Sequence, residues 1–209
     1  MSAPPRGGGT RARLLEAAEN EFARYGYAGA HLQSIAEQVG VQKTALYYYF
    51  ESKSALYTAV IESMLEAFEK AIAAAVASEG SHRERLERLL AVFNDLLAGK
   101  PQYARILMRI FIDGAGPDYR AIGPAIRRVI GSVLEFYRGG VDAGTFRRHS
   151  ARHLFQSLFG MMLFHYATPE FSAAVLEVED IFAADAVAWR RDAVRQLLLR
   201  GVLPDPDES

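Results

Sequence analysis

The side chains best suited to making specific hydrogen bonds cluster near the N-terminus, in the segment from Gln42 to Tyr49 (QKTALYYY). Its amide, ammonium and hydroxyl groups can bind the base edges of a DNA major groove or the phosphates beside it. Leu46 and Phe50 are four residues apart and would form the buried side of a short helix, with Thr44 and Tyr48 on the opposite side. The alternative is a surface helix with amphipathic tyrosines, because aromatic residues at helical spacing are usually core residues.

A second short helix is predicted just before this segment, and the two would have to be held together by a turn. Residues 32–39 carry apolar side chains at three- and four-residue spacing, and Gly40 follows them. Two short helices joined by a glycine-containing turn of three or four residues are typical of a helix-turn-helix. A helix from Thr10, as the N-cap, to a stop at Gly26 would supply the packing surface. Its apolar stripe is predicted to be Leu14, Leu15, Ala18, Phe22 and Tyr25.

The rest of the chain predicts helices and connections, with none of the two-residue alternation that indicates strands. Ser52 is placed to cap a long helix over residues 53–77 that has no internal glycine or proline. Helices are expected at about 82–98 after a Ser81 cap, 101–112, 118–143 with a kink or restart at Pro124, 151–167 after a Ser150 cap, and 185–202. Residues 113–117 are expected to form a loop, and residues 170–184 a less regular connection. The prediction is an all-α chain of three short helices, a linking helix and a bundle of about five.

Composition sets the broad class of the protein. Half of the 209 residues are hydrophobic and 23% are charged, which is typical of a globular protein. The net charge is only −1, so any affinity for DNA must come from locally placed groups. There is no cysteine, no apolar run of membrane-spanning length and no apolar signal segment at the N-terminus. We therefore expect a soluble cytoplasmic protein that has no membrane partner.

Several positions in residues 10–57 agree in register with a known motif: Thr10-Arg11, Phe22 before Gly26-Tyr27, Ile35-Ala36, and Gly40-Val41 before Leu46-Tyr47-x-Tyr49-Phe50-x-Ser52-Lys53-x-x-Leu56. In these positions the chain resembles the TetR family of transcriptional regulators. The resemblance implies an N-terminal three-helix helix-turn-helix DNA-binding domain, joined by a long linking helix to a C-terminal helical ligand-binding and dimerisation bundle. The DNA-binding domain is expected at residues 10–55 and the second domain at residues 56–209, after a flexible arm at residues 1–9.

The resemblance further implies a homodimer that binds a near-palindromic double-stranded DNA operator with half-sites roughly 34 Å apart. The residues at the family's DNA-contact positions are Gln33, Gln42, Lys43, Thr44, Tyr47, Tyr48, Tyr49 and Lys53. Gln33 suits adenine, Lys43 suits guanine and Thr44 suits a thymine methyl group, whereas the tyrosines and Lys53 suit phosphates. Ala30 and His31 replace the family's usual hydroxyl residues before the second helix, which makes His31 a candidate cap and phosphate contact. Ala45 replaces a common threonine.

The predicted helix at residues 151–167 is apolar nearly all round, which is more than one core face requires. Together with the predicted helix at 185–202, and with the same two helices of a second subunit, it would form a four-helix dimer interface. The predicted lining of a pocket for a small apolar or amphipathic effector is Phe93, Tyr103, Leu107, Phe111, Phe136, Phe155, Met162 and His165. Plain core packing is the alternative for each of these residues. Arg105 and Arg109 could meet an anionic head group, or could instead form a solvated face or a salt bridge.

Enzymatic chemistry finds no support in the sequence, which lacks the GxSxG, P-loop and HExxH patterns and any cysteine nucleophile. His149 and His153 could hold a metal at i, i+4 spacing, but no third ligand is evident, and no cofactor is expected. The leading hypothesis is a ligand-responsive regulator of the repressor type, in which the effector shifts the linking helix. The alternative is a helical small-molecule binding protein without specific DNA recognition.

Overall fold

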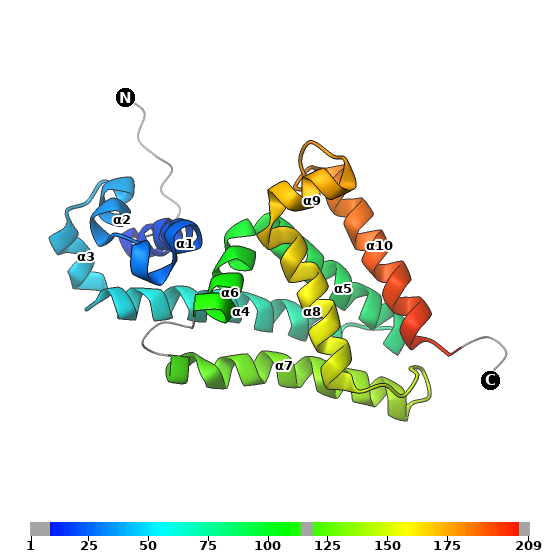
Figure 1. The fold of residues 1–209 in the computed structure, drawn as a ribbon. Coiled ribbons are helices and arrows are strands. Elements are labelled where there is room, and N and C mark those ends of the chain that lie inside the picture. Colours follow the sequence, from blue (N-terminus) through cyan, green and yellow to red (C-terminus); the bar gives the residue numbers. More distant parts are fainter. Residues whose placement is uncertain (1–8, 114–118, 205–209) are drawn as a thin grey trace.

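A computed structural model describes residues 9–113 and 119–204 of the chain, and every regular element in these residues is an α-helix (Figure 1). The helices are α1 (Thr10–Gly29), α2 (Leu32–Val39), α3 (Lys43–Tyr49), α4 (Lys53–Ala77), α5 (His82–Gly99), α6 (Pro101–Asp113), α7 (Tyr119–Asp142), α8 (Ala151–Ala167), α9 (Pro169–Leu176) and α10 (Ala184–Val202). The all-α prediction is confirmed. The loop expected at 113–117 and the arm expected at 1–9 fall almost wholly outside the described residues.

Helices α1, α2 and α3 form a small unit at one end of the molecule, packed on the start of α4 (Figure 1). Leu14, Ile35 and Leu46 are fully buried at its centre. The predicted stop of α1 at Gly26 is a break, with φ at +69°, after which the helix resumes as far as Gly29. This left-handed conformation favours glycine. The break leaves Tyr25 exposed, so its assignment to the buried stripe was wrong.

Helix α4 connects this unit to the rest of the chain and is about 37 Å long at a rise of about 1.5 Å per residue. Ser52 caps it as predicted, because its side chain accepts a hydrogen bond from the N–H of Ala55 at 3.0 Å. Leu56 is buried near the start of α4 and Ile72 towards its end. One continuous helix therefore belongs to the core at both ends of the molecule.

The remaining helices follow the predicted ranges, with two differences. Helix α7 continues through Pro124, where a kink or restart was expected; the proline removes only the one backbone hydrogen bond that its own N–H would have donated. Helix α9 was not predicted; its proline in the first turn favours helix initiation, and Glu177 ends it in a left-handed conformation. Among the described helices, none is long and apolar enough to cross a membrane.

Candidate DNA-binding surface and interior cavity

Helix α3 presents two different sides. Leu46 is fully buried and Phe50 follows it into the core, whereas Tyr47 is 46% and Tyr48 85% exposed. Gln42, Lys43 and Thr44 are also exposed at the start of this helix. Their amide, ammonium and hydroxyl groups therefore face away from the core on one short helix, in the arrangement that recognition of a DNA groove requires.

Hydrogen bonds at the end of α2 hold the turn between α2 and α3. Gly40 has φ at +76°, and its N–H donates to the carbonyl of Glu37 at 3.0 Å. The N–H of Val41 donates to the carbonyl of Ala36 at 3.0 Å, so two carbonyls at the end of α2 are satisfied. Arg13 satisfies a third, because its Nη2 donates to the carbonyl of Val39 at 2.6 Å. Helix α1 therefore helps to hold the turn in place.

Two of the predicted contact residues are engaged within the chain. The Nε2 of Gln33 donates to Oε1 of Glu37 at 2.7 Å on the exposed side of α2, so reading a base would exchange this hydrogen bond. Lys53 is half-buried; its Nζ donates to the carbonyl of Ala28 at 3.1 Å and lies 5.1 Å from the ring centre of Tyr27. Burial lowers the pKa of Lys53. This lysine therefore ties the start of α4 to the segment after the α1 break.

The N-terminus of α2 is capped from α1 rather than by its own residue. His31 occupies the N-cap position without a side-chain hydrogen bond, and its backbone N–H donates to Oε1 of Glu21 at 3.1 Å. Glu21 is buried and also accepts a hydrogen bond from Nε2 of Gln38 at 3.4 Å. A carboxylate at a helix N-terminus also interacts favourably with the helix dipole. The imidazole of His31 does not replace the missing hydroxyl as a cap and stays exposed.

Arg11 is a further cation near the recognition helix that the residue pattern did not single out. Its guanidinium carbon lies 5.1 Å from the ring centre of Phe50, directly after α3, and its side chain is exposed. The stacking holds a positive charge near the C-terminal end of α3. The arginine's place in the TetR-like opening of α1 was the signal in the sequence that could have identified it.

A cavity of about 700 Å³ lies between α4, α5, α6, α7, α8 and α10. Six of the predicted residues line it: Phe93, Leu107, Phe111, Phe136, Phe155 and Met162. Among the described residues, the wall is apolar apart from Gln156 and the phenol of Tyr137, and none of the residues that line it is charged. A cavity of this size is within the range of small-molecule sites in proteins.

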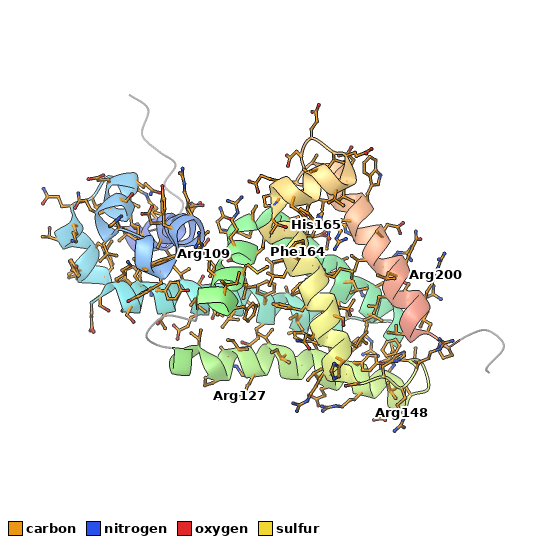
Figure 2. The ribbon with its side chains drawn as sticks, in the orientation of Figure 1. Arg109, Arg127, Arg148, Phe164, His165 and Arg200 are labelled. Atoms are coloured by element: carbon orange, nitrogen blue, oxygen red, sulfur yellow. The ribbon has the colours of Figure 1, made fainter. Side chains whose placement is uncertain are left out.

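Tyr103 and His165 lie outside this lining. Tyr103 is buried on the side of α6 near Glu19, and burial raises its pKa to about 12. His165 is buried near α9, where its backbone carbonyl accepts a hydrogen bond from Ser172 at 2.9 Å (Figure 2). Burial and the nearby charge of Arg190 lower the pKa of His165 to about 4. Helical spacing placed both residues on apolar faces, but those faces pack against other elements.

The buried His165 predicts a loss of stability in acid. Its pKa is about 4 in the folded chain and near 6.5 when unfolded, so below pH 6.5 the unfolded chain binds a proton that the folded chain does not. The free energy of unfolding should fall as the pH is lowered from 6.5 to 4, by up to about 3 kcal/mol. In urea titrations across this range, His165→Gln should flatten the pH dependence and the exposed control His153→Gln should not. Equal slopes for both variants would contradict the assignment.

Helix α6 connects the cavity to α1. Arg109 donates from Nε to the carbonyl of Ala23 at 3.0 Å and from Nη2 to the carbonyl of Arg24 at 2.7 Å (Figure 2). These carbonyls lie just before the Gly26 break, which interrupts the hydrogen-bond ladder of α1. Gln102 of α6 also donates from Nε2 to Oδ1 of Asn20 at 2.7 Å, and Lys100, just before α6, places its Nζ 3.5 Å from Oε2 of Glu19. Arg109 therefore faces α1 rather than a ligand head group.

The histidine pair at the start of α8 gives no support to a metal site. The Nε2 of His149 lies 2.9 Å from the carbonyl of Gly201 and is occupied by that hydrogen bond. Within the described residues no group of three or more histidine, cysteine, aspartate or glutamate side chains could hold a metal ion.

Comparisons with known proteins agree with this architecture. Residues 14–60 match the family model of bacterial regulatory proteins of the tetR family. The chain is 28% identical over 196 residues to the HTH-type transcriptional regulator RutR of Escherichia coli, covering 91% of this chain and 89% of RutR. Two solved structures share the fold. KstR2 of Mycobacterium tuberculosis has a TM-score of 0.77 and 16% identity, and the match covers 96% of this chain and 98% of KstR2. FadR of Bacillus subtilis in complex with stearoyl-CoA has a TM-score of 0.70 and 20% identity, and the match covers 91% of this chain and 98% of FadR.

Residues 14–60 therefore carry the DNA-binding domain of the tetR family, and the chain is similar to a regulator of this kind along most of its length. The protein is a DNA-binding transcriptional regulator and not an enzyme.

Proposed function

We propose that this regulator is a cytoplasmic, homodimeric repressor that a small apolar or amphipathic molecule releases from a near-palindromic operator. Residues 10–55 would bind DNA, and residues 56–209 would bind the effector and dimerise. The observation that carries the proposal is the link from the exposed face of α3, through α1 and α6, to an apolar cavity. The stearoyl-CoA bound to the similarly folded FadR supports an effector with a large apolar part.

The DNA contacts follow from the exposed groups of α3. Lys43 and Thr44 are placed at its start to reach base edges, and Tyr47 and Tyr48 project phenol hydroxyls suited to phosphates. Tyr49 lies beside Tyr48, with their ring centres 5.2 Å apart in an edge-to-face arrangement. Gln42 supplies a further amide at the N-cap position.

Dimerisation is supported by apolar side chains that the single chain leaves uncovered on α8 and α10. Trp189 and Leu197 are each 63% exposed and lie eight residues apart on one side of α10. Phe164 is exposed on α8 (Figure 2), and a side chain at Gly160 would meet no atom within 4 Å in the single chain. A small residue there would allow a second copy to approach closely. We infer that these two helices pack against their counterparts in a second subunit.

Effector binding could reach α1 through the opposite sides of α6. Leu107, Met108 and Phe111 line the cavity, and Arg109 between them holds the carbonyls of α1. A ligand that pushes α6 outward would move α1 and, with it, α3. Such a ligand changes DNA affinity only by the difference between its affinities for the two arrangements.

Arg109→Met should weaken this coupling. We expect faster amide hydrogen exchange in residues 20–30 and loss of any protection that DNA binding confers on α6, because the contacts to Ala23 and Arg24 are gone. The matched control is Arg105→Met, one turn earlier on α6, where the described residues record no hydrogen bond to α1. If Arg109→Met and the control gave the same exchange pattern, α6 would not be coupled to α1 through Arg109.

Hydroxyl-radical footprinting on the DNA upstream of the protein's own gene tests the proposed operator geometry. A dimer should protect two patches on one face of the duplex, separated by roughly 34 Å or a multiple of it. One isolated patch would contradict binding as a dimer. If the protein protected no DNA at any protein concentration, and small molecules still raised its melting temperature, a small-molecule binding protein without specific DNA recognition would be favoured instead.

A further inference from the structure

The wall of the apolar cavity, called the slot below, extends over several turns of two helices. Its wall includes residues of α8 from Ala151 to Phe164, which are separated by about 20 Å along the helix at a rise of about 1.5 Å per residue. On α7 the wall runs from Ile126 to Tyr137, and is likewise elongated. The length of an acyl chain is about 15 Å in a bilayer, where one leaflet makes up half of a hydrocarbon core about 30 Å thick. A single acyl chain therefore fits the length of the slot.

The wall restricts the part of a ligand that enters the slot to hydrocarbon. Gln156 is exposed at its edge, and the hydroxyl of Tyr137 already donates to the carbonyl of Arg147 at 2.7 Å. A charged or strongly polar group inside would lose its hydration without gaining a hydrogen-bond partner, which is strongly unfavourable. Any charge on the ligand must lie beyond the end of the slot.

A second, polar hollow of about 330 Å³ adjoins that end. It shares Tyr137 and Ala151 with the wall of the apolar cavity. Arg138, Arg148 and Arg152 contribute to it, with Asp142 as the one acidic residue among its wall residues. All three arginines are exposed, and the described part of the chain provides none of them with an ion pair or hydrogen bond. Guanidinium groups bind carboxylate and phosphate groups in a bidentate manner.

We propose that the effector is a single-chain amphiphile whose hydrocarbon tail fills the slot and whose anionic head group, a carboxylate or a phosphate, binds the arginine hollow. This inference rests on the proposed function, because it takes the cavity as the effector site. It deepens that proposal by assigning the head-group site and the sign of its charge. The hollow lies at the junction of α7 and α8, so the ligand would join these two helices.

Isothermal titration calorimetry with a set of equal-length probes tests the assignment. The probes are tetradecanoate, tetradecyl phosphate, tetradecan-1-ol and tetradecyltrimethylammonium, each below its micelle concentration. At least one anion should bind roughly tenfold more tightly than the alcohol, since charge-assisted hydrogen bonds to arginine are strong. The cation should bind more weakly than the alcohol. The order of the two anions distinguishes a carboxylate from a phosphate head group.

Two variants separate the head-group site from the slot. Arg148→Gln combined with Arg152→Gln should remove the preference for the anion and leave alcohol binding unchanged, whereas Arg127→Gln should change neither. Arg127 is an exposed arginine on α7 outside the hollow, and Arg148 lies in the segment between α7 and α8 (Figure 2). Leu158→Trp, which adds bulk to the slot wall, should weaken all probes alike.

The inference is overturned if wild type binds anion and alcohol equally, if the double variant keeps the anion preference, or if no probe binds. Binding of the same preparations to the protein's upstream DNA separates this failure from a failure of the proposed function. Intact specific DNA binding without amphiphile binding overturns the ligand assignment alone. Loss of specific DNA binding in the wild type overturns the proposed function itself.

Discussion

Lys43→Ala is expected to lower affinity for the operator between about tenfold and a hundredfold while leaving affinity for shuffled DNA nearly unchanged. Lys43 is exposed at the start of α3, where an ammonium group can reach guanine O6 and N7, and one such contact contributes about 1–3 kcal/mol of discrimination. Fluorescence anisotropy titrations of both duplexes at one fixed salt concentration measure the two affinities.

Two comparisons make this prediction specific. Tyr47→Ala should weaken binding to operator and shuffled duplex alike, because a phosphate contact carries no base information. Lys70→Ala is the matched control for lost charge, since Lys70 lies well along α4 and pairs with Glu66 at 3.7 Å on an exposed surface. If Lys70→Ala reduced operator affinity as much as Lys43→Ala, overall charge rather than the position of α3 would explain the binding.

The double variant Trp189→Glu, Leu197→Glu is expected to yield a folded monomer whose operator affinity is lower by at least roughly a hundredfold. Both side chains are 63% exposed in the single chain, so the substitutions should not disturb its core. In a dimer they would bury four carboxylates against apolar surface, which is strongly unfavourable. A monomer engages one half-site only and loses the gain from linked binding.

Sedimentation velocity measures the first effect and anisotropy the second. Ile112→Glu is the control, because Ile112 is an exposed apolar residue on α6, a helix that is not assigned to the interface. A double variant that sedimented as a dimer would contradict the assignment of this surface to the interface.

Local patterns predicted many features of the fold, although Gly9 and not Thr10 occupies the N-cap position of α1, and Ser150 makes no side-chain hydrogen bond at the start of α8. The stripe of α2 and the opposed sides of α3 depend on residues three and four apart, and the structure buries Ile35 and Leu46 as expected. The Ser81 cap is another example, since Ser81 and Glu84 form a capping box within four residues. Such features need no knowledge of tertiary structure.

Features that depend on distant residues were not accessible in the same way. Glu21 caps α2 from ten positions upstream of His31, and Arg109 donates hydrogen bonds to carbonyls of α1 that lie more than eighty residues before it. Neither partner has a local signature. His165 shows the same limit in the cavity, because helical spacing identified an apolar side of α8 without indicating that α9 would cover that end.

The net charge of the chain, −1, is too small to produce tight binding to DNA on its own, so we expect specific recognition by the exposed groups of α3. The most direct test is anisotropy titration of the protein against its own upstream DNA and a shuffled duplex, from about 50 to about 200 mM salt. Affinity for the upstream DNA should be at least roughly 10³-fold greater than for the shuffled duplex, and log affinity should decline linearly with log salt for both. Affinities that are the same for the two duplexes at every salt concentration would contradict this expectation.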